Sequence, residues 1–210
     1  MAPDQATPRG PDVTPDVTPD VTALRAAAAD AGLAVLSSAS WPETSADTAV
    51  PALAGFIESS FSPLLAEVAT RALRRRPHGA AAAAATAIVI VTAFGDTASA
   101  AHVAAAVDAG RRVSPLLFFQ SVPNAVAGHV AARWNLTGPV ACVSGIRAGL
   151  GIAALFLAEA DADEALIVHV DLPAGGGLGA GAALLATQRT GTIPDPHEPP
   201  PGGSDEDPRY

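Results

Sequence analysis

Apolar and polar positions alternate along the middle of the chain in two periods, one typical of strands and one typical of helices. Short runs rich in valine and isoleucine predict strands, and longer segments rich in alanine and leucine predict helices between them. Residues 87–92 are apolar at nearly every position, as expected for a strand that is covered on both faces. Strands interleaved with helices predict an α/β fold, with a mostly parallel mixed sheet of about five strands and helices on both faces. The predicted strands are 33–37, 87–92, 140–144, 165–170 and 181–187, and the predicted helices are 23–31, 64–75, 99–109, 125–134 and 147–160.

The two ends of the chain have a different composition. Residues 1–22 contain the sequence PDVT three times in succession, and a proline at every fourth position blocks both helices and sheet ladders. Residues 190–210 are rich in proline, glycine and acidic side chains. We therefore predict one domain, at residues 23–189, flanked by disordered tails at 1–22 and 190–210.

Most of the net charge of −9 lies in these tails. Residues 1–22 carry four aspartates and one arginine, and residues 190–210 carry five acidic residues and one arginine, so the middle is nearly neutral. A domain without a basic face does not fit nucleic-acid binding. No apolar run is both long enough and free enough of polar residues to be a good membrane-spanning segment. The N-terminus lacks the basic segment followed by an apolar segment that a signal peptide has. We expect a cytoplasmic protein with neither nucleic acid nor membrane as a partner.

The sequence also argues against a metal or cofactor site. A single cysteine, Cys142, excludes a disulfide framework and any multi-cysteine metal site, and the histidines fall on separate elements. A glycine-rich segment at 175–181 runs on into a G-x-G-x-x-A pattern, but a dinucleotide-binding fold needs that turn early in the domain. We interpret this segment as a connection between two strands, and we expect no metal and no cofactor.

Several motifs are similar to one known family. The stretch SPLLFFQSVPNAVAG at 114–128 resembles the S-P-x-x-F-x-x-S-V-x-N-A-x-A-G stretch of ketosynthase-like N-terminal-domain proteins. Gly138-Pro139, the strand at 165–171 and the segment 53–69 resemble the same family. Its members are small proteins that accompany polyketide, polyene and aryl-polyene pathways. The resemblance covers about residues 50 to 185 and implies the N-terminal half of a thiolase-like fold.

The chain departs from the active enzymes of this family at the position of the nucleophile. In active ketosynthases the condensing cysteine lies about nine residues after the glycine of the G-P pair, at the tip of a helix. Counted from Gly138, that position holds Arg147. A guanidinium group stays protonated and cannot attack a thioester. The catalytic histidines of the family belong to the C-terminal half of the full enzyme, which this sequence does not contain, so we expect no condensing activity.

Three other residues are weak candidates for thioester chemistry: Cys142, Ser144 and His129. Cys142 lies between apolar residues, which would raise the pKa of its thiol, and we interpret it as a buried small hydrophobic residue. His129 lies one turn into a predicted helix, where it would either line an acyl pocket or serve as a hydrogen-bonded structural histidine. We favour the structural role.

Another group of residues is a candidate for contacts with an acyl group or a partner. Ser121 and Asn124 would either offer hydrogen bonds to a carrier arm or form a turn and a helix cap, and we favour the cap. Arg147 would stand at the positive end of a helix dipole, where a cation is disfavoured. Its side chain would therefore have a paired carboxylate, bind an anionic ligand, block the vacant pocket or face solvent. Phe118 and Phe119 complete this group.

The predicted helix after Arg147 indicates that the chain needs a partner. Residues 148–158 contain no polar side chain, and a helix that is apolar all round must be covered on every side. In the resembled fold this helix lies between the sheets of two halves, and dimers pair through the strand at 140–144. We therefore expect a homodimer, or a heterodimer with a ketosynthase or another pathway enzyme, and acyl carrier protein is a further candidate partner. The predicted interface residues are Val140, Ala141, Val143, Leu150, Leu155 and Phe156.

Three functional hypotheses follow. The first is a catalytically inactive ketosynthase-like accessory subunit of bacterial polyketide or fatty-acid-type (polyene) biosynthesis. The second is a thioester-processing enzyme of the acyltransferase type that uses Cys142 or Ser144. The third is an assembly protein that binds no acyl group.

Overall fold

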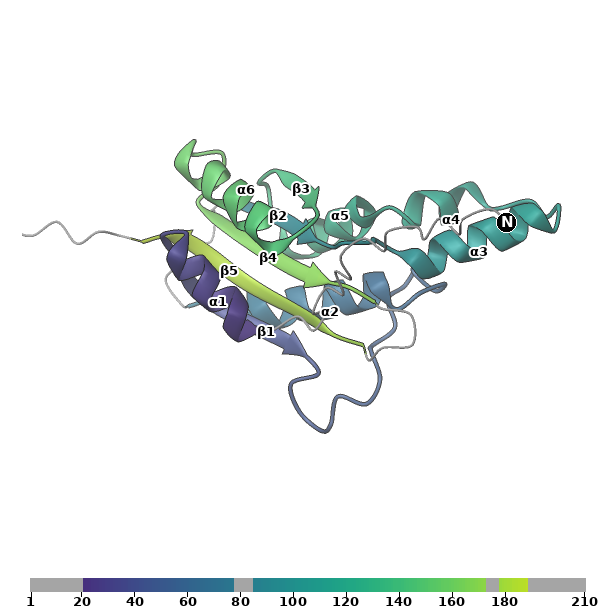
Figure 1. Cartoon of the computed structure of the whole chain (residues 1–210), viewed down its shortest axis with the longest axis horizontal. Coiled ribbons are helices and arrows are strands. Elements are labelled where there is room, and N and C mark those ends of the chain that lie inside the picture. The colour runs from purple at the N-terminus through teal and green to yellow at the C-terminus, as the bar shows by residue number, and fades with distance from the viewer. Residues whose placement is uncertain (1–20, 78–84, 173–177, 189–210) are drawn as a thin grey trace, which may run out of the picture.

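The structure is a computed structural model that describes residues 21–77, 85–172 and 178–188 (Figure 1). The first helix begins at Val21, just inside the predicted N-terminal tail, and both tails otherwise lie outside the described residues. Residues 175–177 of the glycine-rich segment also lie outside them. The elements are α1 (Val21–Asp30), β1 (Leu33–Trp41), α2 (Phe61–Arg74), β2 (Thr86–Val91), α3 (Thr97–Asp108), α4 (Pro115–Gln120), α5 (Pro123–Trp134), β3 (Val140–Val143), α6 (Ile146–Ala158), β4 (Glu164–Val170) and β5 (Ala180–Thr187).

The strands form one five-stranded mixed sheet in the order β1-β5-β4-β2-β3, which confirms the predicted fold class. β2 pairs in parallel with both β3 and β4, whereas β5 is antiparallel to both β4 and β1. Two of the four strand pairings are therefore parallel. All six residues of β2 are buried, as the sequence predicted for a strand covered on both faces. β1 and β3 are the edges.

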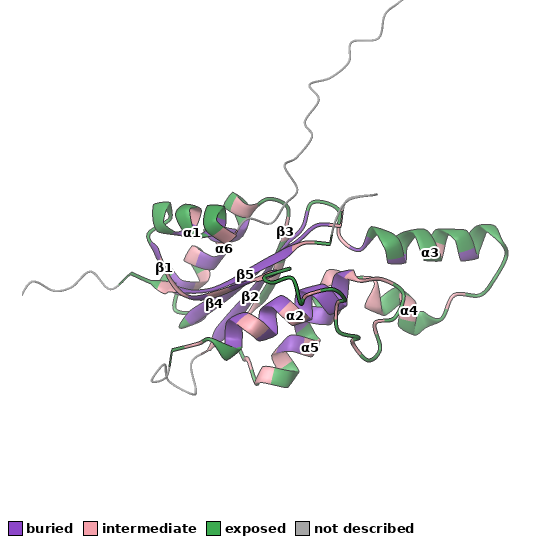
Figure 2. Cartoon of the chain, turned by 90° about the horizontal axis from the view of Figure 1, so that it is seen from below, coloured by how far each residue is buried: buried purple, intermediate pink, exposed green. Residues whose placement is uncertain are grey.

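Helices cover both faces of the sheet, again as predicted. Figure 2 shows the sheet between two layers, with α1 and α6 on one side and α2 and α5 on the other. Side chains of each strand alternate between the layers: in β2, Ile88 and Ile90 pack towards α2 and α5, and Val89 and Val91 pack towards α1 and α6. The molecule thus has two apolar cores, one on each face of the sheet.

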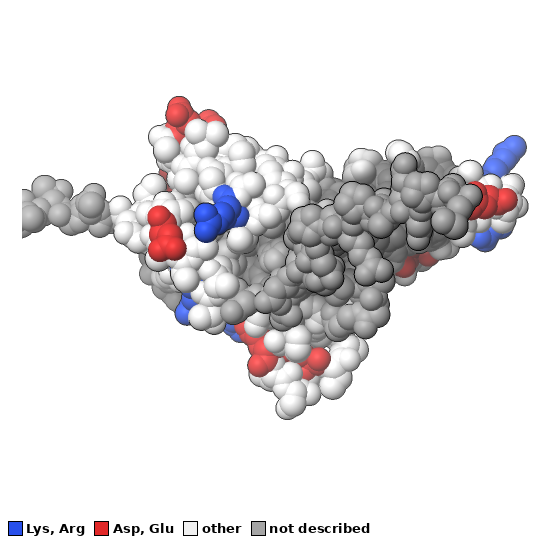
Figure 3. Space-filling view, viewed as in Figure 1, with Lys and Arg blue, Asp and Glu red and all other residues white. Residues whose placement is uncertain are grey.

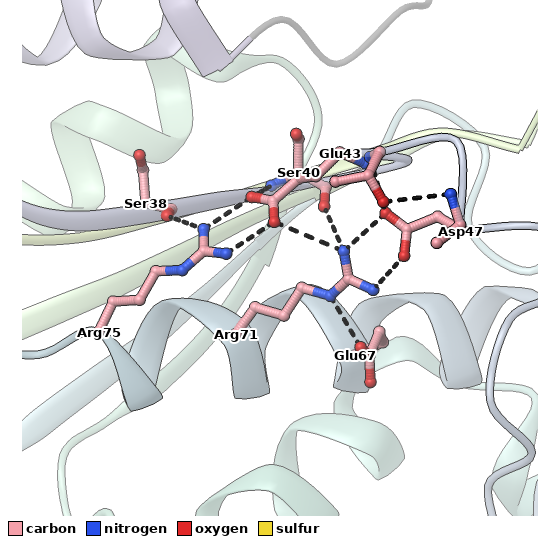
Figure 4. Close-up of polar contacts among 9 residues, drawn as sticks. Ser38, Ser40, Glu43, Asp47, Glu67, Arg71 and Arg75 are labelled. Carbon is pink, nitrogen blue, oxygen red and sulfur yellow. Dashed lines mark hydrogen bonds and ion pairs between the residues drawn. The ribbon is translucent and has the colours of Figure 1, made fainter.

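A charged network holds the loop after β1 against α2 (Figure 4). The guanidinium of Arg71 donates to both carboxylate oxygens of Asp47, at 2.7 and 3.0 Å, and to Glu67 at 2.8 Å. It also lies 4.6 Å above the centre of the Trp41 ring. Arg75 makes two 2.7 Å hydrogen bonds to Glu43. These bonds hold the pKa of each bonded loop carboxyl below its ordinary value, far below it for Asp47, so both stay ionised.

One part of the chain is barely packed against the rest. Figures 1 and 2 show α3 and α4 extending beyond the sheet. Only Ser99 and Ala106 of α3 are buried, and no residue of α4 is. The sequence did not predict α4, which begins at Pro115 after the capping hydroxyl of Ser114. We call residues 94–122 the arm.

Candidate functional site

The start of α6 lies where the sequence places the nucleophile of active ketosynthases. β3 ends at Val143, the chain turns at Gly145 with φ 88°, and α6 begins at Ile146. That φ is in the region where glycine is favoured. The turn lies at the carboxyl end of a parallel strand, the edge where α/β sheets bind their ligands. Arg147 is the second residue of α6, so the predicted position at the helix tip is confirmed.

The side chain of Arg147 is exposed, and its charge has no partner among the described residues. Within the part of the chain that the structure describes, it forms no ion pair and no hydrogen bond. It lines a groove of about 340 Å³ between α1 and α6, together with Asp30 and Leu150. Asp30 does not reach it as an ion-pair partner, so the predicted paired carboxylate is absent among the described residues. The unpaired guanidinium of Arg147 therefore lies at the positive end of a helix dipole.

Close packing against the sheet fixes this helix tip. A Cβ atom added to Gly149 would lie 2.5 Å from Cγ2 of Val91 and 3.1 Å from Cδ1 of Ile167. α6 can therefore approach β2 and β4 only because this position has no side chain. The rigid contact sets where the first turn of α6, and Arg147 with it, stands relative to the strand ends.

A buried polar cluster that the sequence reasoning missed follows the ends of the neighbouring strands. The carboxylate of Asp171 accepts hydrogen bonds from the Thr92 hydroxyl at 3.0 Å and from the Ala93 amide at 2.8 Å, and lies 3.0 Å from Nε2 of His169. Burial alone would raise the pKa of Asp171, but these three groups outweigh it and lower that pKa. The signal was the spacing of His169 and Asp171, two apart at the end of a strand, which places both on one face.

The predicted nucleophiles are not brought together. Cys142 is exposed, which contradicts its interpretation as a buried residue. It lies on the edge strand β3 opposite Ile90, whose side chain packs on the α2 and α5 face, whereas α6 covers the other face. Partial burial raises the pKa of its thiol, which makes it a poor nucleophile. No hydrogen bond among the described residues joins Cys142 to Ser144 or His129.

His129 is not the satisfied structural histidine that we favoured. Its Nε2 atom is fully buried and has no hydrogen-bond partner. Its ring meets the ring of Phe56 edge-on, with the centroids 6.1 Å apart. An unpaired buried nitrogen is costly and requires an explanation.

The junction of α4 and α5 holds the remaining predicted site residues. Asn124 is exposed at the second position of α5, and Val122 occupies the cap without a side-chain bond, so the predicted asparagine cap is wrong. The Ser121 hydroxyl donates to the carbonyl of Phe118 at 2.7 Å, in keeping with the predicted turn. Phe118 and Phe119 are 67% and 64% exposed, so both rings are available to another molecule.

The predicted partner surfaces are open in the single chain. β3 pairs with β2 on one side only, and Val140 is 40% exposed. Ala141 and Val143 are half-buried. α6 buries one face against the sheet and leaves the other uncovered, and Figure 3 shows the surface over α6 as mostly uncharged.

Two of the predicted interface residues on α6 differ in their availability. Leu155 is 51% exposed. Leu150 is only 3% exposed and packs in the core of its own chain, so the prediction that Leu150 lies in an interface is wrong. Phe156 packs partly against the same core.

Comparison with known proteins assigns the family. The sequence profile of the family described as "Beta-ketoacyl synthase, N-terminal domain" matches residues 37–176, two thirds of the chain. The chain belongs to this family. The matched part of this β-ketoacyl synthase N-terminal domain runs from β1 past β4, so it contains the start of α6 and the polar cluster around Asp171. Among curated proteins, none matches the sequence.

Two solved structures show the same fold. One is a ketosynthase (ApeO) in complex with its chain length factor (ApeC) from Xenorhabdus doucetiae, with a TM-score of 0.52 and 20% identity, where the match covers 80% of this chain and 72% of the other. Another is a β-ketoacyl synthase from Burkholderia phymatum STM815, with a TM-score of 0.51 and 15% identity, covering 81% and 57%. The chain therefore spans little more than half the length of the second structure.

The described residues of this β-ketoacyl synthase N-terminal domain contain no cluster of three side chains that would hold a metal ion. None of its helices, within the same residues, has the length and apolar character needed to cross a membrane.

Proposed function

We propose that this chain is a ketosynthase-like accessory subunit that carries out no condensation and works bound to a partner. The observation that carries the proposal is Arg147 at the second position of α6, where the active enzymes hold their cysteine. A protonated guanidinium offers no lone pair for attack on a thioester. The thiol of Cys142, on the opposite face of the sheet and with a raised pKa, does not replace it.

The need for a partner is supported by three unpaired surfaces. The free edge of β3, the outer face of α6 and the exposed rings on the arm all leave hydrogen-bonding groups or apolar side chains in water. One solved structure with the same fold is a ketosynthase in complex with a chain length factor. We infer the same kind of arrangement here, in which the partner is a second copy or a ketosynthase of a cytoplasmic polyketide or polyene pathway.

Intact-protein mass spectrometry tests the absence of condensing chemistry. The purified chain is incubated with acyl thioesters of acyl carrier protein, alone and with the candidate partner ketosynthase. We expect no covalent adduct on the wild type. An adduct that disappears in Cys142→Ala or in Ser144→Ala would support the thioester-processing enzyme instead.

The variant Arg147→Cys is the matched control. It places a thiol at a helix N-terminus, where the dipole lowers the thiol pKa, so we expect it to gain an acyl adduct. Failure of this variant to react, with folding retained and the partner present, would show that the tip of α6 meets no acyl group. The assembly protein without acyl binding would then be the better description.

A further inference from the structure

A recess lies in the outer helix layer, between α2, α5 and the loop that carries Leu53. Its wall follows one face of α2, where Pro63, Ala66 and Thr70 are buried. The cavity volume is about 180 Å³. Since α2 and α5 cover the face of the sheet opposite α6, this recess is separate from the helix tip described above.

Two arginines without ion-pair partners line the recess. Arg74 is the last residue of α2, and Arg133 lies in the last turn of α5. Both are exposed, and neither forms an ion pair or hydrogen bond within the residues that the structure describes. The nearby Arg71, Arg75 and Arg76 each pair with a carboxylate. Arg74 and Arg133 thus differ from these three neighbouring arginines in having no partner among the described residues.

The same recess holds an unpaired polar group. The Thr70 hydroxyl forms no hydrogen bond among the described residues. The Glu67 carboxylate also lines the recess, but Arg71 binds it at 2.8 Å. A ligand with acceptor oxygens would satisfy the hydroxyl of Thr70.

Helix dipoles account for only part of this arrangement. Cations are favoured at the C-terminal ends of helices even when no ligand is present, which is reason enough for Arg74 and Arg133 to be there. The dipoles do not account for the unbonded hydroxyl of Thr70, nor for a recess walled by buried side chains. A ligand accounts for all of these features together.

We propose that this recess binds a small organic anion, a carboxylate or phosphate monoester with a short apolar group. Its charged head would pair with the arginine forks of Arg74 and Arg133, which suit both head groups. Its apolar part would lie against Leu53, Pro63 and Ala66. The proposal is independent of the partner-bound function argued above, because it uses none of the same surfaces.

Titrations of the ¹⁵N-labelled full chain, followed by amide chemical shifts, test the site. The probes are hexanoate and hexyl phosphate, with acetate and inorganic phosphate as head groups that lack the apolar part. Sodium chloride keeps the ionic strength constant. We expect saturable shifts around Thr70 and His129, and at least tenfold tighter binding of the better hexyl probe than of its bare head group. The better of the two hexyl probes identifies the head group.

Variants separate the recess from general charge effects. Arg74→Gln with Arg133→Gln should weaken binding at least tenfold, whereas the lysine pair at the same positions should retain part of it. The matched control is Arg111→Gln with Arg112→Gln, two exposed arginines on the arm, which should bind as the wild type does. Equal binding by both glutamine pairs, or shifts that chloride reproduces, would overturn the proposal. So would hexyl probes that bind no better than their bare head groups.

Discussion

At the scale of single residues, the most constrained positions are glycines in contact with the backbone or the sheet. Gly138 precedes β3, and its amide donates to the carbonyl of Thr86 at 3.2 Å. An added Cβ atom would lie 2.5 Å from the Ala87 nitrogen and 2.5 Å from the Thr86 carbonyl carbon. Both neighbours are main-chain atoms of the central strand β2, which cannot move aside without breaking its pairing. The G-P pair of the sequence motif therefore has a packing reason.

Gly138→Ala should lower the free energy of unfolding by about 3 kcal/mol or more, because overpacking against backbone has no low-cost relaxation. The matched control is Gly128→Ala on α5, where an added Cβ meets nothing within 4 Å. That change should leave stability unchanged or raise it by about 0.5–1 kcal/mol, as alanine is favoured in helices. Urea denaturation measures both. Equal stability of the two variants would show that the close contact at Gly138 is not present in solution.

The charged network on α2 predicts a pH dependence whose sign can be worked out. The pKa values of Asp47 and Glu43 are lowered in the folded chain from ordinary values of 3.8 and 4.5. A lowered folded-state pKa means that the network stabilises the fold fully above the ordinary value and loses this contribution as the pH falls through the folded one. The wild type should therefore lose stability between pH 5 and pH 3.

Arg71→Gln combined with Arg75→Gln should reduce this loss, because the two carboxyls then titrate near their ordinary values in both states. Asp171, whose pKa is lowered by other groups, contributes to both proteins alike and cancels in the comparison. Urea denaturation at pH 7, 5, 4 and 3 gives the two slopes. Parallel pH profiles would mean that the arginine pairs do not hold these carboxylates in the folded chain.

At the scale of elements, periodicity predicted every strand and all helices but one, because buried segments carry strong patterns. β1 runs on to Trp41, beyond the predicted end at residue 37, since small serines and alanines pair with β5 without an apolar run. α4 was missed because a six-residue helix is too short to show a helical period.

The candidate site was less predictable than the fold. Burial of Cys142 was wrong because apolar neighbours in the sequence do not reveal that β3 is an edge strand. The position of Arg147 was predicted, because counting from a motif needs no tertiary information. The bonds that Asp171 accepts from Thr92 and Ala93, and the recess beside His129, depend on how segments far apart in sequence pack, which no local pattern contains.

At the scale of the whole molecule, the chain has a sheet covered on both faces but a helix, α6, that is covered on only one. Leu155 and Leu150 lie on the same helix and have opposite environments, 51% and 3% exposed. If the outer face of α6 binds a partner, Leu155→Glu should leave the free energy of unfolding of the isolated chain within about 0.5 kcal/mol of wild type, as surface changes do. The same change should weaken association at least tenfold, because it would bury a charge in an apolar interface.

Leu150→Ala provides the opposite result, a loss of about 2–5 kcal/mol in stability from a cavity in the core. Sedimentation velocity across a range of concentrations, with and without the candidate ketosynthase, measures association, and urea denaturation measures stability. The two leucines thus distinguish a buried surface that stabilises the fold from an exposed surface that binds a partner. Association that is unchanged by Leu155→Glu would exclude the outer face of α6 as the interface, and the free edge of β3 or the arm would have to supply it.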